Sequence, residues 1–187
     1  MSDELLVELH LLSHQKQFKT NALFAVGLHT VFKAFTQGYR PESHTIALFD
    51  ALCSSNGFDA ESLRNQAQAT LDEAKQHSDQ DSEAWLSQFR LDDDSHYSRL
   101  MGIGVFSLLE ASQSDAGNTQ ASDLKDDATG LAERLNISAA RLEKDITLYL
   151  SSRERLEQAV ELMEETLASD RRKREQRQAE ATQGSSK

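Results

Sequence analysis

The 187 residues include one proline and eight glycines, so long helices can run almost without interruption. The net charge of −11 disfavours general nucleic-acid binding, because phosphate backbones repel an acidic protein. The single cysteine, Cys53, excludes an intramolecular disulfide and a cysteine-based zinc cluster, and its apolar setting indicates a small buried side chain.

Apolar residues recur with helical periodicity in the first forty positions and predict helices over residues 3–17 and 21–37. The second of these is apolar nearly all round, so we expect it to form the centre of the core. Gly38 would end it, before a turn at residues 39–41. Phe24 and Phe32 are its expected core residues.

A third helix is predicted after this turn, with Ser43 as its capping residue. Its buried face would carry Ile46, Phe49 and Leu52. A fourth helix is predicted over residues 59–77, after a stop signal formed by an Asn-Gly pair.

Two further helices are predicted in the middle of the chain, a short one at residues 85–89 and a longer one at 95–111. An acidic run at residues 92–94 precedes the longer helix and would suit the positive end of its dipole. Gly102 and Gly104 inside this helix lower its propensity, so we expect them to permit close contact with another helix.

The last third of the chain is predicted to hold a loop at residues 112–122, a helix at 123–135 and a turn at 136–138. Ser138 would cap a long final helix. The apolar positions of that helix are spaced alternately four and three residues apart, which is a heptad seam. These positions are Leu142, Ile146, Tyr149, Leu156, Val160, Met163 and Leu167, and Arg153 is the polar interruption.

These patterns predict an all-α fold, a multi-helix bundle with a long protruding C-terminal helix of coiled-coil type. We expect the bundle over residues 1–137, the long helix with its basic end over 138–182, and a disordered tail at 183–187. No stretch approaches the about 20 apolar residues that a membrane span needs. The acidic start of the chain indicates neither a signal peptide nor a transit peptide.

No constellation of catalytic residues is evident. His10 and His14 are four residues apart on one helix face, as metal ligands can be, but no third ligand is apparent. No histidine can be assigned to a serine or cysteine nucleophile, and no strand precedes a glycine-rich phosphate loop. We therefore expect no enzymatic activity, no cofactor and no metal.

Residues 128–148 allow a rival interpretation, because two helices with a tight turn between them fit a helix-turn-helix. The second helix would present Arg141 and Lys144, but also Glu143 and Asp145. That mixture does not build a surface that follows phosphates, and tight helical turns are ordinary in all-α proteins. A DNA-binding regulator is the alternative function.

A basic segment, defined here as Arg171, Arg172, Lys173 and Arg174, has three interpretations. It can be a solvated helix end, where cations suit the helix dipole, or a contact with anionic lipid, or a docking site for an acidic partner. The last two gain weight because the rest of the chain is acidic. With Arg153, these four are the candidate partner-binding residues.

Four blocks of sequence resemble the thylakoid formation protein family, which is involved in photosystem II biogenesis in cyanobacteria and plastids. The blocks are ELLVELHLLS at residues 4–13, ALFAVGLHTVF at 22–32, QGYRPE at 37–42 and YSRLMGIGVF at 97–106. The region from Leu131 through the basic heptad helix is similar to the C-terminal coiled coil of that family.

The resemblance implies an all-helical bundle with a protruding C-terminal helix and no enzymatic activity. It implies a role in thylakoid membrane organisation and in photosystem II assembly or repair, with the FtsH protease complex as a partner. The protein would lie peripherally on the thylakoid membrane, on the cytoplasmic side in a cyanobacterium, and would bind no nucleic acid. Whether the heptad seam pairs with the bundle, with a second copy or with another protein is left open.

Overall fold

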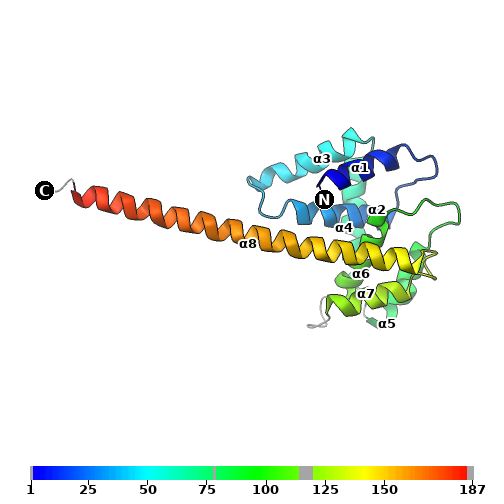
Figure 1. The fold of residues 1–187 in the computed structure, drawn as a ribbon. Coiled ribbons are helices and arrows are strands. Elements are labelled where there is room, and N and C mark those ends of the chain that lie inside the picture. Colours follow the sequence, from blue (N-terminus) through cyan, green and yellow to red (C-terminus); the bar gives the residue numbers. More distant parts are fainter. Residues whose placement is uncertain (1, 78, 114–119, 185–187) are drawn as a thin grey trace. The chain divides into compact units, whose positions relative to one another are not determined.

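The computed structural model describes residues 2–77, 79–113 and 120–184, and these ranges contain helices and no strand (Figure 1). Two short 3₁₀ helices are η1 (Glu42–His44) and η2 (Ser87–Phe89). The α-helices are α1 (Ser2–Ser13), α2 (Ala22–Phe35), α3 (Thr45–Ser55), α4 (Ala60–Ala74), α5 (Asp79–Leu86), α6 (Arg99–Ser112), α7 (Ala121–Gly130) and α8 (Ala139–Gly184). The all-α fold class predicted from the sequence, with its long C-terminal helix, is confirmed.

The helices α2 and α6 cross at the centre of the body, and both are buried on nearly every side. Glycines make this crossing possible. A methyl group on Gly104 would overlap the carbonyl of Leu23, and one on Gly27 would overlap the carbonyl of Leu100. The expectation that Gly104 permits close helix contact is confirmed, and Gly27 supplies the matching gap on α2. Phe24 is fully buried beside this crossing.

The start of α3 differs from the prediction. Ser43 lies inside η1 and forms no side-chain cap, because the 3₁₀ turn leads directly into α3. Phe49 is buried as expected, but the Ile46 side chain is 59% exposed. Ile46 sits in the first turn of α3, where it lines an open pocket instead of packing into the core.

Contrary to the prediction, the acidic run at residues 92–94 does not lie directly before a helix. Helix α6 begins only at Arg99 and has no acidic residue in its first turn. Asp93 has another role. Its carboxylate accepts a hydrogen bond of 3.0 Å from the Asn136 amide, which also donates to the Leu91 carbonyl at 3.1 Å. These bonds fasten the loop before α6 to the turn before α8.

The turn before α8 is longer than predicted. Helix α7 ends at Gly130, and residues 131–137 form a turn whose apolar side chains are buried. In this turn the Ile137 amide donates to the Ala132 carbonyl at 2.9 Å. Asn136 adopts a positive φ of 57°, a conformation that asparagine tolerates well. Helix α8 starts one residue after Ser138, whose carbonyl accepts the first helical hydrogen bond. Of the loop predicted at 112–122, residues 114–119 lie outside the described residues.

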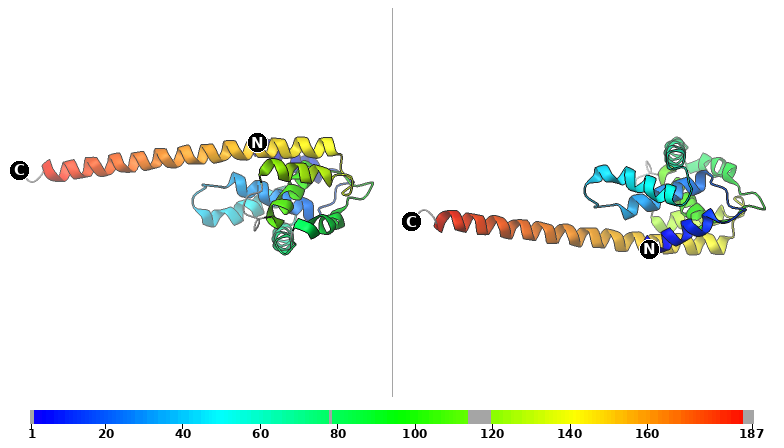
Figure 2. Two further views of the ribbon diagram at one scale, coloured as in Figure 1. Left: turned by 90° about the horizontal axis from the view of Figure 1, so that it is seen from below. Right: turned by 90° about the horizontal axis from the view of Figure 1, so that it is seen from above.

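The chain divides into two compact units, Met1–Ser152 and Arg153–Lys187. Helix α8 begins in the first unit and continues without a break into the second (Figure 2). Within the first unit, Leu142, Ile146 and Tyr149 of α8 belong to the core. The second unit consists of α8 alone, and residues 185–187 of the predicted disordered tail lie outside the described residues.

Candidate partner-binding surface

The second unit is a single helix that carries the C-terminal part of the apolar seam. Leu156 and Val160 are half-buried, whereas Met163 and Leu167 are 53% and 55% exposed. Leu162, beside the seam, is 65% exposed. Large apolar side chains are normally exposed singly, so a helical row of them indicates a surface that contacts another molecule.

Arg153, the polar interruption of the seam, is at the start of the second unit. Its Nε lies 3.7 Å from Oε1 of Glu157, one helical turn further on, and its side chain is 27% exposed. An ion pair of this length at a surface contributes only a few tenths of a kcal/mol, roughly 0.3–0.5 for a helical pair. The guanidinium therefore lies along the seam, and its pair with Glu157 adds little to the stability of the helix.

Charges on the second unit are separated along the helix. Residues 154–165, called the acidic stretch here, have five carboxylates and one arginine. The basic segment follows after Asp170, and its four side chains are all exposed. The structure thus places Arg171, Arg172, Lys173 and Arg174 together, on consecutive residues of one helix, and apart from Arg153. Their concentrated positive charge can attract carboxylates, phosphates or anionic lipid headgroups.

The polar groups inside the first unit mainly connect its helices. The Glu8 carboxylate on α1 accepts two hydrogen bonds from the Arg99 guanidinium on α6, at 2.7 and 3.1 Å. Burial raises the pKa of Glu8, although the Arg99 charge opposes that shift. Nearby, the Tyr97 hydroxyl donates to Asp145 on α8 at 3.0 Å, and burial together with that carboxylate raises the Tyr97 pKa.

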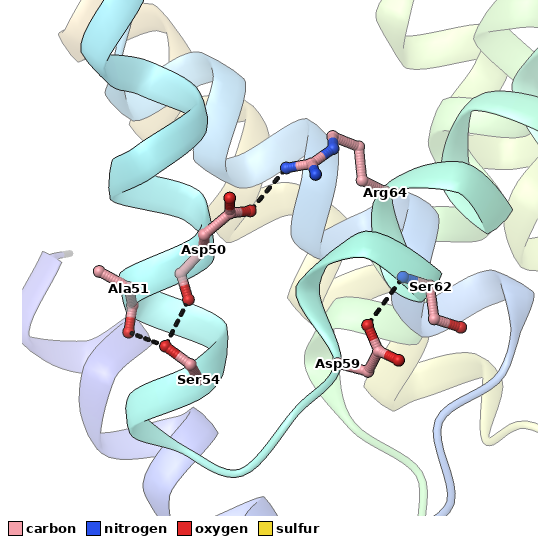
Figure 3. Close-up of polar contacts among 6 residues, drawn as sticks. All are labelled: Asp50, Ala51, Ser54, Asp59, Ser62 and Arg64. Atoms are coloured by element: carbon pink, nitrogen blue, oxygen red, sulfur yellow. Dashed lines mark hydrogen bonds and ion pairs between the residues drawn. The ribbon is translucent and has the colours of Figure 1, made fainter.

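A second set of polar contacts joins α3 to α4 (Figure 3). Arg64 on α4 donates to Asp50 on α3 at 2.6 Å, and Asp59 caps α4 by accepting from the Ser62 amide at 3.0 Å. On α3, the Ser54 hydroxyl donates a hydrogen bond of 2.6 Å to the Asp50 carbonyl of the same helix. These contacts bridge two helices, cap one of them or return to the backbone of the same helix, and each of these roles is structural.

The histidine pair and the cysteine that the sequence singled out lie in different surroundings. The rings of His10 and His14 contact each other edge to face, with centroids 4.6 Å apart, on the surface of α1. Within the described ranges, no group of three or more histidine, cysteine, aspartate or glutamate side chains is placed to hold a metal ion. Cys53 is fully buried, as predicted.

An open groove that the sequence did not reveal lies among α2, α4, α6 and the start of α8. Its lining combines His29 and Lys33 of α2 with Lys75, Glu110 and Tyr149. Burial, followed by the charge of Lys33, lowers the pKa of His29 and favours its neutral form. The lining mixes charges of both signs, so it does not define one class of ligand.

Part of the segment considered as a helix-turn-helix is buried in the core. Leu142 is fully buried, and Asp145 accepts the hydrogen bond from Tyr97. The exposed side chains alternate in charge, since Glu143 lies between Arg141 and Lys144 and pairs with Lys125 at 3.5 Å. DNA binding by this segment stays a prediction.

None of the helices in the described ranges is both long enough and apolar enough to cross a membrane. Separately, the basic segment of the second unit is exposed and carries the charge that anionic headgroups attract.

Comparison with known proteins gives matches along the chain. A family model described as thylakoid formation protein matches residues 1–178. Protein Thf1 of Parasynechococcus marenigrum (strain WH8102) is 56% identical over 183 residues, covering 98% of this chain and 85% of that protein. Protein Thf1 of Nostoc punctiforme (strain ATCC 29133 / PCC 73102) is 36% identical over 196 residues, covering 96% and 83%. The solved structure of Psb29 matches with a TM-score of 0.77 at 26% identity, covering 92% of this chain and 86% of that one.

Proposed function

The chain belongs to the thylakoid formation protein family, and on that premise we propose that it is a non-catalytic adaptor in thylakoid membrane organisation and photosystem II assembly and repair. Its partners are the FtsH protease complex and photosystem II assembly components. It works peripherally on the thylakoid membrane, on the cytoplasmic side. The membership, and the likeness to Psb29, support this role at the level of the family.

The observation that carries the adaptor role is the second unit itself. A helix with an exposed apolar row and an exposed basic segment gives two kinds of contact along one element. Binding surfaces of this type act through complementary charge and shape and need no reactive group. This fits an adaptor better than an enzyme.

We propose the basic segment as the electrostatic contact. Four consecutive cations, all exposed, contribute about 1 kcal/mol each near an anionic surface, and the same charges accelerate encounter with an acidic protein. Arg153 is proposed as the contact that fixes register along the seam, because a single charge among apolar seam positions selects which partner fits.

The test is affinity capture of the tagged full chain from gently solubilised cyanobacterial thylakoids, with mass spectrometry of the co-purifying proteins. One variant replaces Arg171, Arg172, Lys173 and Arg174 by glutamine. A matched control replaces four glutamates of the acidic stretch by glutamine, so it makes the same number of charge-removing changes on the same helix. The four are Glu157, Glu161, Glu164 and Glu165.

Recovery of FtsH subunits or photosystem II components by the wild type and the control, with loss in the basic-segment variant, is the expected result. Recovery by all three proteins would move the contact away from the basic segment. Recovery by none would contradict the adaptor role. Flotation with vesicles of anionic or zwitterionic lipid then tells membrane contact from protein contact, because only membrane contact survives without protein partners.

A further inference from the structure

The seam of the second unit has a spacing that reads the same in both directions. Its six positions are separated by three, four, three, four and three residues. These positions are Arg153, Leu156, Val160, Met163, Leu167 and Asp170. The four inner positions are apolar, and the two ends carry opposite charges. A sequence with this property can pair with an inverted copy of itself.

We propose that residues 153–170 of α8 pair antiparallel with the same residues of a second copy of this chain. If Val160 faces Met163 of the second copy, then Leu156 faces Leu167 in the same register. The dyad produces each of these pairs twice, which gives four consecutive apolar layers. The paired stretch is about 27 Å long at 1.5 Å per residue.

The charged ends of the seam select this arrangement. In the antiparallel register, Arg153 of each copy faces Asp170 of the other, so both ends of the apolar stretch are closed by an ion pair. A parallel dimer would put Arg153 against Arg153 and Asp170 against Asp170, and like charges at seam positions are destabilising. The charges at the two ends of the seam therefore favour the antiparallel direction over the parallel one.

The C-terminal half of the apolar seam is uncovered, whereas Leu156 and Val160 are half-buried. Met163 and Leu167 are more than half exposed, although they are large apolar side chains on a regular helix. One feature limits the affinity. The flanking Glu157 approaches Glu164 of the second copy in this register, and the dyad repeats that like-charge contact. We expect a weak dimer, with a dissociation constant on the order of 100 μM.

The pairing leaves the two basic segments free. Each follows directly after Asp170, so the dimer presents one basic segment just outside each end of the paired stretch. Two such segments on one particle bind an anionic surface more tightly than either alone, because the second contact is intramolecular. This inference goes beyond the proposed function and does not depend on which thylakoid protein is the partner.

The test is sedimentation velocity of the purified full chain from about 10 μM to about 1 mM, with no other protein present. Arg153→Asp and Asp170→Arg are each expected to weaken self-association by at least about tenfold, because each creates two like-charge contacts. The double variant carrying both changes restores both ion pairs with their charges exchanged. Its dissociation constant is expected to return to within about threefold of the wild-type value. Circular dichroism checks that each variant keeps its helix content.

A second pair of variants tests the apolar layers. Met163→Glu places a carboxylate in the seam and should abolish dimerisation, whereas Leu162→Glu, one residue away and off the seam, should leave it intact. A wild type that is monomeric at about 1 mM would overturn the proposal. So would a double variant as weak as the single ones. Single variants that associate as strongly as the wild type would also overturn it, because in a parallel pair each change only exchanges one like-charge contact for another. The capture experiment above can succeed or fail independently of these outcomes.

Discussion

The thiol of Cys53 is packed inside the first unit between charged neighbours. The side chain has no exposed surface, and burial together with the carboxylate of Asp50 raises its pKa to about 11, against a small opposing effect of Arg64. Because the thiolate is the nucleophile, a thiol with this pKa is almost entirely in its inert form near neutral pH. Cys53 therefore acts as a small apolar side chain on the buried face of α3.

We therefore predict that Cys53 resists labelling by a thiol reagent at pH 8 and reacts only when the protein opens. In urea above the unfolding midpoint, one thiol per chain should react at once. The matched control is Ser54→Cys in a Cys53→Ala background, because Ser54 is exposed one residue further along α3. The control should be labelled rapidly in the native state. Rapid labelling of native wild type would contradict the burial of this thiol.

The crossing of α2 and α6 depends on two backbones coming closer than side chains allow. The added methyl group would meet main-chain carbonyl atoms at Gly27 and Gly104, and main chain cannot move aside as a flexible side chain can. At Gly102 the nearest atoms belong to the side chains of Tyr97 and Leu142. The three glycines should therefore differ in how well they tolerate substitution.

Gly104→Ala is predicted to lower the free energy of unfolding by at least about 2 kcal/mol, because overpacking must push α2 and α6 apart. Gly102→Ala should cost less, since Tyr97 and Leu142 can adjust. Gly130→Ala is the control. It lies at the end of α7 with nothing within 4 Å of the added methyl, so it should be neutral or stabilise by up to about 1 kcal/mol. Urea denaturation measures all three, and equal losses for Gly104 and Gly130 would exclude the close crossing.

Helix identity could be predicted from the sequence better than helix boundaries. Periodicity reports which face is apolar, and it correctly marked α2 as the core helix. Boundaries depend on hydrogen bonds that arise only in the folded chain. Asp93 suited a helix start by its charge, but its carboxylate is engaged by Asn136, which comes 43 residues later, and α6 starts after it. The exposure of Ile46 could not be predicted either, because it depends on which part of α3 the other helices cover.

At the scale of the whole molecule, the candidate surface could be predicted in part. The seam and the basic segment are properties of one helix, so local sequence contains them completely. The groove among α2, α4 and α6 could not be predicted, because its lining comes from residues scattered between His29 and Tyr149. Likewise the pair of Glu8 with Arg99 joins positions 91 residues apart, and no local pattern indicates it.

The two units differ in what they need to be stable. The first unit has a continuous core that includes Leu142, Ile146 and Tyr149 of α8. The second unit is one helix, and an isolated helix of this kind gains little from packing within itself. The sequence placed the end of the bundle at residue 137, and the contacts of the chain place a division after Ser152. A pair of truncations distinguishes these two positions.

A variant ending at Ser152 is predicted to keep the unfolding free energy of the full chain within about 1 kcal/mol, because it retains every core residue of the first unit. A variant ending at Ile137 loses three buried side chains, of which Leu142 and Ile146 are fully enclosed. At roughly 1.5–3 kcal/mol each, that loss approaches the whole stability of a typical domain. Urea denaturation followed by fluorescence of Trp85, which is buried in the first unit, measures both.

Each outcome of this experiment locates the boundary of the body. If only the longer variant gives a cooperative transition, the first four turns of α8 are part of the body and the partner-binding surface begins at Arg153. If the shorter variant is equally stable, the body ends before α8 and the whole helix is available to partners. We expect the first result, because Ile146 and Tyr149 are buried members of the core of the first unit.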